Sequence, residues 1–144
     1  GQNKLDAAAT HYQRALAINP HNPKTHLNLG QLRRAQGDTD SAENHYRQSL
    51  SLDPNYFRAQ LSLGHLYFAT EEYKAAQDAY TQALSTAPNS PDAHNGLGTT
   101  LAIQGLYSQA QHHYEQALQF NPTHSRAQEN LQRILQLVKG ESPQ

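Results

Sequence analysis

Nine histidines are the residues of this 144-residue chain with the clearest capacity for chemistry. A helix presents two imidazoles to one metal ion when they lie three or four residues apart, and no two histidines have that spacing. His112 and Glu115 are three residues apart, but a single pair makes a weak site. His11, His45 and His113 are separated by multiples of 34 residues, which duplication of a repeat explains better than ligation. We therefore expect no metal ion and no other cofactor.

Motifs that position catalytic groups are also missing. The patterns G-x-S-x-G, G-x-x-x-x-G-K and G-x-G-x-x-G do not occur. The acidic segment at 38–40 lacks the glycine and glutamate of a calcium loop, and is better interpreted as the polar start of a helix. Cysteine is absent, which excludes disulfides, thiolate metal sites and a cysteine nucleophile. We therefore expect no enzymatic activity.

The composition describes a polar chain without strong net charge. Hydrophobic residues make up 36% and charged residues 16%, the mean hydropathy is −0.85 and the net charge is −1. Such a balance argues against nucleic acid or an anionic membrane as the partner. No apolar run approaches the ~20 residues that span a bilayer. The composition does not fix the cellular compartment.

A period of 34 residues organises the sequence. Several residue types recur at this interval across four registers. The matching sets are Pro20, Pro54, Pro88 and Pro122; Ala8, Ala42, Ala76 and Ala110; Tyr12, Tyr46, Tyr80 and Tyr114; Leu29, Leu63, Leu97 and Leu131; and Gly30, Gly64 and Gly98, where the fourth register has Gln132. Self-similarity at this period predicts a repeat architecture.

The spacing inside each repeat is helical. Ala42, Tyr46 and Leu50 follow one another at four-residue steps and form one apolar stripe. The predicted start signals are Asn22-Pro23 and Ser90-Pro91, and the predicted left-handed stop signals are Gly37 and Gly105. The prediction is eight helices, at roughly 4–18, 23–36, 39–52, 57–70, 73–86, 91–104, 107–120 and 125–138.

The segment NLGQLRRAQGDTDSAENHYRQSLSLDP, with its Leu-Gly pair, alanine, aromatic residue and final proline, resembles a tetratricopeptide repeat (TPR). The resemblance covers nearly the whole chain. It implies an all-α, right-handed superhelical solenoid of antiparallel helix pairs. The implied divisions are the second helix of a truncated TPR at 1–22, complete TPRs at 23–56, 57–90 and 91–124, a C-terminal capping helix at 125–139 and a tail at 140–144. Starting in mid-repeat predicts an excised fragment.

Packing within the repeats can also be anticipated. The repeat glycines should leave room for the repeat alanines of the partner helix, and the repeat tyrosines should fill the gap to the next repeat with their hydroxyls near solvent. TPRs often carry a large aromatic residue at position 4 of the repeat. His26, Gln60 and His94 stand there in this chain, which predicts looser or more polar contacts near each helix start.

The last predicted helix keeps an apolar face, formed by Ile134, Leu135, Leu137 and Val138. One interpretation is a terminal cap that covers the core. The alternative is head-to-tail self-association, in which this helix pairs with residues 4–18 of a neighbouring copy.

In TPR proteins the first helices of successive repeats line a concave face, and the resemblance places a peptide-binding groove there. The implied groove residues are Lys24, Leu27, Asn28, Gln31, Arg34, Arg58, Leu61, Ser62, His65, Phe68, Asn95, Thr99, Arg126, Asn130 and Arg133. Positions on this face, which also include Asp92 and Glu129, carry five cations and two acids. The balance of +3 favours a peptide with acidic groups, held by arginine forks and amides, with Leu61 and Phe68 as an apolar anchor. The alternative is an ordinary solvated surface.

The function implied is a scaffold for protein–protein interaction whose partner is a protein or peptide. The alternatives are a substrate-presenting or targeting arm of a larger enzyme, and a self-assembling structural unit. The carboxylate clamp that some TPRs use for chaperone C-termini is not matched, since it needs Lys and Asn where Leu27 and Gln31 stand, and Asn where Ser62 stands. The Asn ladder of the repeats in O-linked sugar transferases is half broken by Ser62 and Gly96.

Overall fold

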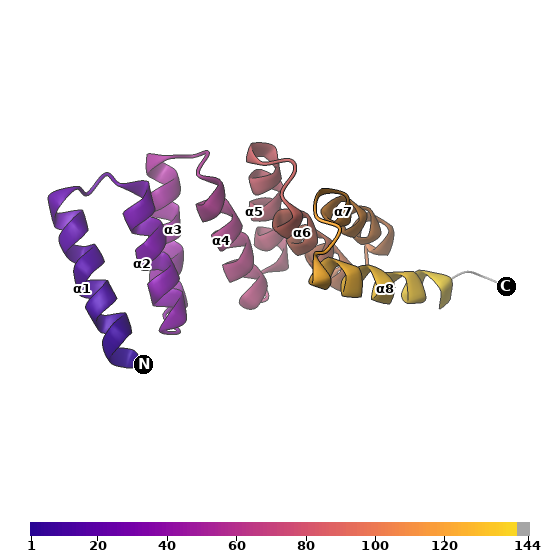
Figure 1. Ribbon diagram of the computed structural model, residues 1–144, viewed down its shortest axis with the longest axis horizontal. Coiled ribbons are helices and arrows are strands. Elements are labelled where there is room, and N and C mark those ends of the chain that lie inside the picture. The colour runs from indigo at the N-terminus through magenta and orange to yellow at the C-terminus, as the bar shows by residue number, and fades with distance from the viewer. Residues whose placement is uncertain (141–144) are drawn as a thin grey trace. The chain divides into compact units, whose positions relative to one another are not determined.

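The computed structural model describes residues 1–140, and these residues form eight α-helices (Figure 1). The helices are α1 (Gln2–Ile18), α2 (Pro23–Ala35), α3 (Thr39–Leu52), α4 (Phe57–Ala69), α5 (Tyr73–Thr86), α6 (Pro91–Ile103), α7 (Tyr107–Phe120) and α8 (Ser125–Gly140). Each predicted helix end lies within two residues of the observed one. Helix α8 includes Gly140, the first residue of the predicted tail, and the rest of that tail lies outside the described residues.

The chain divides into two compact units, Gly1–Leu66 and Tyr67–Gln144. The division falls within α4. In the first unit, α2 packs against α1 and α3. In the second unit, α6 packs against α5 and α7, and α8 packs against α7 and α6.

The helix boundaries follow from their capping residues. The Asn22 side chain accepts hydrogen bonds from the backbone N–H groups of Lys24 and Thr25, at 3.0 and 3.3 Å, directly before Pro23. Ser90 caps α6 in the same way, through a 3.2 Å bond from the Ala93 N–H. The predicted stop signals are confirmed, because Gly37 and Gly105 have φ angles of 81° and 77°.

At the equivalent position after α4, the chain has Glu71, with a φ of 63°. A side chain in this region is disfavoured by roughly 1–2 kcal/mol. The backbone N–H of Glu71 donates to the Phe68 carbonyl at 3.2 Å, and that of Glu72 donates to the Tyr67 carbonyl at 2.8 Å. The turn after α4 therefore keeps the hydrogen bonding of a helix C-cap without glycine.

The core of each unit is built around a tyrosine of the repeat. Tyr46 of α3 is fully buried in the first unit, and Tyr80 and Tyr114 are buried in the second. A Cβ atom at Gly30 would lie 2.5 Å from the Tyr46 ring, and one at Gly98 would lie 2.8 Å from the Tyr114 ring. The room predicted for alanine is therefore taken mainly by tyrosine rings, although the Ala42 and Ala110 carbonyls are also near these glycines.

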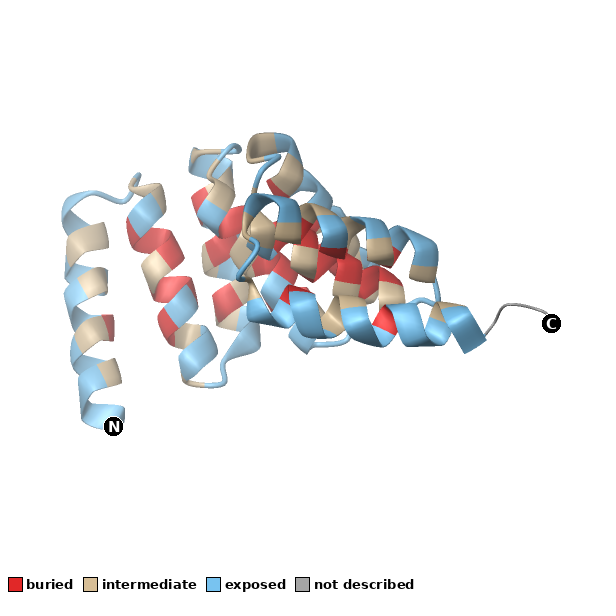
Figure 2. Ribbon diagram, turned by 45° about the vertical axis from the view of Figure 1, so that its right-hand side comes forward, coloured by how far each residue is buried: buried red, intermediate tan, exposed pale blue. Residues whose placement is uncertain are grey.

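Helix α1 covers the start of the first unit. Its Ala9 is buried against Leu29 and Leu32 of α2, with Leu5 and Leu16 partly buried beside them. Figure 2 shows that the buried and half-buried positions of α1 lie on one side of the helix, while the opposite side is exposed. The helix is therefore amphipathic, as the repeat pattern predicts.

The polar residues at position 4 of the repeat tie the starts of α2, α4, α6 and α8 to the loop before each of these helices. His26, Gln60 and His94 are buried, whereas Gln128 is exposed. In every case the side chain contacts the carbonyl oxygen of a proline six residues earlier. The contacts are His26 Nε2 with Pro20 at 3.1 Å, Gln60 Nε2 with Pro54 at 2.8 Å, His94 Nε2 with Pro88 at 2.9 Å, and Gln128 Nε2 with Pro122 at 2.8 Å. The contacts are polar, as predicted, but the short distances show that they are not loose.

Candidate functional site

A pocket of about 220 Å³ lies in the first unit, among α2, α3 and α4. Its lining residues are Gln31, Arg34, Tyr46, Arg58, Leu61, Ser62 and His65, and we call this set the Arg34–Arg58 pocket. Six of the seven belong to the predicted groove. Tyr46 does not, because it lies on α3 rather than on the first helix of a repeat.

Helical periodicity brings the lining residues together. Gln31 and Arg34 are three residues apart and share one face of α2. Arg58, Leu61, Ser62 and His65 follow each other at steps of three, one and three, so they share one face of α4. The α2 and α4 faces therefore form the walls, and Tyr46 reaches the pocket from α3.

The pocket is cationic. Arg34 and Arg58 are both exposed, and neither takes part in the ion pairs found within residues 1–140, which join Arg47 to Glu43, Lys74 to Asp78 and His124 to Asp92. No acidic residue lines the pocket. Two guanidinium groups without a carboxylate partner are suited to an external anion, which they can hold through paired N–H bonds.

The Tyr46 hydroxyl has no hydrogen-bond partner among the described residues, and it is buried. Arg34 and Ser62 are the polar side chains that lie beside it. Burial raises the pKa of this phenol, and the charge of Arg34 together with polar contacts from Arg34 and Ser62 offsets part of the effect. The hydroxyl does not lie near solvent, so the sequence prediction was wrong here. A buried polar group left unpaired is disfavoured by about 1–3 kcal/mol, so packing alone does not explain it.

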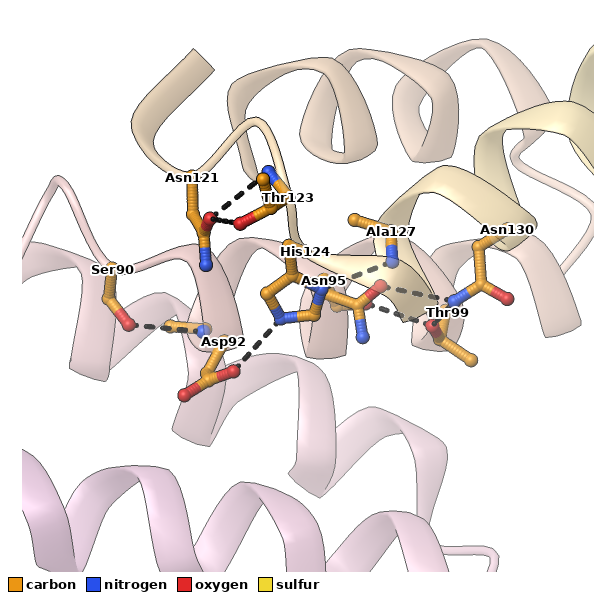
Figure 3. A network of polar contacts seen from close by, with 10 residues as sticks. Ser90, Asp92, Asn95, Thr99, Asn121, Thr123, His124, Ala127 and Asn130 are labelled. Carbon is orange, nitrogen blue, oxygen red and sulfur yellow. Dashed lines mark hydrogen bonds and ion pairs between the residues drawn. The ribbon is translucent and has the colours of Figure 1, made fainter. Parts of the chain in front are cut away.

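The second unit has equivalent repeat positions 68 residues further along the chain. There, side chains at several of these positions form hydrogen bonds with one another. The Tyr114 hydroxyl donates to Thr99 Oγ1 at 3.2 Å. Asn130 Nδ2 donates to Asn95 Oδ1 at 3.0 Å and to Thr99 Oγ1 at 3.3 Å. Figure 3 shows the amide part of this network, in which Asn130 of α8 points towards Asn95 and Thr99 of α6. Three predicted groove residues of the second unit, Asn95, Thr99 and Asn130, therefore bind one another.

The remaining predicted groove residues have varied surroundings. Leu27 is 1% exposed, so it belongs to the core and is removed from the predicted surface. Lys24 is exposed and Asn28 half-buried on α2. Phe68 is half-buried in the second unit, where its ring meets that of Tyr73 edge-on. Arg126 and Arg133 are exposed on α8.

Two histidine pairs lie away from the pocket, and the sequence reasoning missed them. His26 and His45 approach with their Nδ1 atoms 3.5 Å apart, and His94 and His113 with theirs 3.0 Å apart. Each pair joins residues 19 apart on two helices, whereas the sequence search considered only spacings within one helix. Burial lowers the pKa of His45, His94 and His113, that of His113 to about 4.

Within residues 1–140, no three His, Cys, Asp or Glu residues gather in a way that could hold a metal ion. In the same part of the chain, no helix combines the length and apolar character needed to cross a bilayer.

Sequence models of known families match along most of the chain. Models described as tetratricopeptide repeat match residues 33–99 and 91–124, and one described as TPR repeat matches residues 2–33. The chain belongs to the TPR family. No curated protein sequence matches this TPR chain significantly.

Solved structures with the same fold include TPR proteins. The crystal structure of MamA matches with a TM-score of 0.86 and 27% identity, over 96% of this chain and 81% of MamA. That of YrrB, described as a TPR protein with an unusual peptide-binding site, gives 0.81 and 24%, over 88% and 66%. PilF of Pseudomonas aeruginosa gives 0.89 and 18%, over 96% and 64%. The predicted all-α helical-repeat fold is confirmed, and with it the general role of a protein-interaction scaffold.

Proposed function

We propose that this TPR chain binds a segment of a partner protein in the Arg34–Arg58 pocket, and that the segment carries an acidic group. The proposal rests on two guanidinium groups that form no ion pair within residues 1–140 and that line a pocket without any acidic residue. The remaining lining adds the apolar contact of Leu61 and the polar groups of Gln31 and Ser62. This mixture of one apolar anchor and convergent polar groups is typical of ligand pockets.

The surface beside the pocket extends the proposed contact along α2. Lys24, Asn28 and Gln31 follow each other at steps of four and three, which places them on one helical face. Lys24 adds a third positive charge to those of Arg34 and Arg58. A partner segment with acidic residues would therefore meet favourable charge outside the pocket as well as inside it.

The test is binding of the chain to an array of capped peptides of acidic, neutral and basic composition. We expect the acidic peptides to bind. Their affinity should fall as the salt concentration is raised, because salt screens the attraction between exposed charges. The double variant Arg34→Ala/Arg58→Ala should lose at least about tenfold in affinity, since each charged contact contributes more than about 1 kcal/mol.

The matched control is Arg47→Ala/Lys74→Ala, which removes the same charge from exposed pairs elsewhere. Such surface pairs contribute little to stability, so this variant should fold and bind as the parent does. Equal losses of peptide affinity in the two double variants would show a general effect of charge. That result would refute the pocket as the binding site. Binding without preference for acidic peptides would refute the acidic partner.

Self-association is a second proposed function, favoured by exposed apolar side chains at two helices. Ile18 at the end of α1 is 87% exposed, and Leu135 and Leu137 of α8 are 37% and 44% exposed. Light scattering over a concentration series should show growth in mass that Leu135→Gln/Leu137→Gln abolishes. A constant monomer mass at high concentration removes this function.

A further inference from the structure

The hydroxyl of Tyr46 is the feature of the Arg34–Arg58 pocket that packing does not explain. The side chain is 0% exposed, it lines the pocket, and its oxygen has no partner within residues 1–140. A buried phenol hydroxyl that lies beside a pocket and has no acceptor can donate a hydrogen bond to an oxygen atom of a ligand in that pocket.

We propose that the pocket binds the side-chain carboxylate of an internal glutamate or aspartate of the partner, and that Tyr46 is a specificity-determining residue whose hydroxyl donates to that carboxylate. The inference rests on the proposed function of this pocket. It adds the chemical class of the anchoring group and the residue that selects it.

The second unit shows which atoms are missing in the first. At the repeat position of Tyr46, Tyr114 donates to Thr99 Oγ1, and the planar amide of Asn130 lies across Thr99 and Asn95. In the first unit the position of Asn130 is held by Ser62, and that of Thr99 by Gln31. Ser62 has a much shorter side chain than asparagine, and Gln31, although longer than threonine, is exposed. Both line the pocket, which lies where the second unit has the Asn130 amide.

A carboxylate suits that pocket. It is planar and has nearly the shape of the amide that fills the second unit. It also has two acceptor oxygens, one for the Tyr46 hydroxyl and one for a guanidinium fork. Phosphate is tetrahedral and bulkier than the amide it would replace. A C-terminal carboxylate is not favoured, because Leu27, Gln31 and Ser62 stand where the known clamp for chain ends requires Lys and Asn.

Access to the hydroxyl depends on Arg34. The hydroxyl oxygen itself has almost no exposed surface, and Arg34 and Ser62 lie beside it. Arg34 is exposed and forms no ion pair within the described chain, so no carboxylate of the chain holds its side chain in place. A turn of Arg34 towards an incoming carboxylate would both position the ligand and uncover the Tyr46 hydroxyl.

The experiment uses calorimetry to measure the affinity of the chain for four peptides that differ in one feature. Three are capped at both ends and have glutamate, glutamine or phosphoserine at one internal place. The fourth has no acidic side chain, but its C-terminus is free. The variants are Tyr46→Phe, which removes only the hydroxyl, and Ser62→Asn, which fills the pocket with a built-in amide. The matched control is Tyr114→Phe, which removes the equivalent hydroxyl of the second unit.

We expect the glutamate peptide to bind best. Tyr46→Phe should weaken it about tenfold, as expected for a hydrogen bond to a charged group. Ser62→Asn should weaken it at least as much, and Tyr114→Phe should leave it unchanged. The thermal midpoint of Tyr46→Phe should not fall, because the lost hydroxyl has no partner, which separates a binding effect from a folding defect.

Some outcomes would overturn this inference while leaving the proposed function intact, and one would overturn the proposed function itself. Unchanged affinity in Tyr46→Phe, with a loss in Arg34→Ala/Arg58→Ala, would keep the pocket and remove the role of Tyr46. Stronger binding of the phosphoserine or free C-terminal peptide would replace the internal carboxylate with that group. If none of the four peptides bound, the proposed function itself would fail.

Discussion

Tyr46 and Tyr114 occupy the same position of the 34-residue repeat, and both are buried against a glycine of the neighbouring helix. The Tyr114 hydroxyl donates to Thr99, whereas the Tyr46 hydroxyl has no partner in the described part of the chain. Around Tyr114 an amide network fills the space, and around Tyr46 there is a cationic pocket. This difference between network and pocket comes from the side chains on the helix faces around each tyrosine, because the repeat itself is the same.

This contrast shows how a repeat scaffold separates folding from recognition. The ring of each tyrosine is held by the part of the repeat that both units share. Its hydroxyl faces positions that differ, such as Ser62 in one unit and Asn130 in the other. One repeat can therefore close its site with its own side chains, while another leaves the corresponding donors open for a partner.

The largest expected effect tests whether the two tyrosines share one structural role. Tyr46→Ala and Tyr114→Ala should each lower the free energy of unfolding by about 3–5 kcal/mol, as large-to-small changes of buried aromatic residues do. Chemical denaturation followed by circular dichroism measures both. A loss below about 1 kcal/mol for either variant would show that its ring is not part of the core.

The next effect is a dependence of stability on pH that should be stronger in the second unit. The Pro88 carbonyl requires a proton on His94 Nε2, so neutral His94 accepts from His113 at Nδ1. The pKa values of both residues are lowered in the folded state. Stability should therefore be fully present above the unfolded pKa of about 6.5, and should be lost as the pH falls towards 4, by on the order of 2 kcal/mol.

The chain supplies its own control for this pH effect. The middle repeat has Gln60 and Ala79 at the two positions of the histidine pair. The double variant His94→Gln/His113→Ala should therefore keep the contact to the Pro88 carbonyl and show a smaller loss of stability in acid. An unchanged acid transition would mean that other groups cause it.

A third, smaller effect concerns the network that closes the second unit. Thr99→Val removes the acceptor of both Tyr114 and Asn130, and should reduce the free energy of unfolding by about 1–2 kcal/mol. Gln31→Val, at the same repeat position in the first unit, should stay within about 0.5 kcal/mol of the parent, since Gln31 is exposed. If the two variants were equally stable, the network would contribute nothing.

The smallest effect has opposite signs in the two units. Tyr114→Phe should lose about 0.5–1.5 kcal/mol with its hydrogen bond, and Tyr46→Phe should be neutral or gain up to about 1 kcal/mol. Matched thermal and denaturant unfolding of the two variants measures the difference. Parallel losses would mean that the Tyr46 hydroxyl is satisfied in solution.

Much of the fold could be predicted because its signals are local. Asn22 and Ser90 cap helices through their own side chains, and Gly37 and Gly105 end helices through their own backbone conformation. The periodic apolar stripe then fixes which face of each helix is buried. The predicted helices therefore agree with the observed ones.

The site was predicted only in part, because its other features depend on contacts between helices. Arg34 and Arg58 were found from repeat position, but the burial of Leu27 and the role of Tyr46 depend on packing. The bond from Asn130 to Asn95 joins residues 35 apart, and no spacing rule for one helix anticipates it.

The contact between position 4 of each repeat and the proline carbonyl six residues earlier is made by either histidine or glutamine. The codons of these two amino acids differ by a single base. A point mutation can therefore exchange a proton-binding group for an inert one while the loop stays anchored. Acid tolerance in such an array can evolve repeat by repeat, independently of the surface that meets the partner.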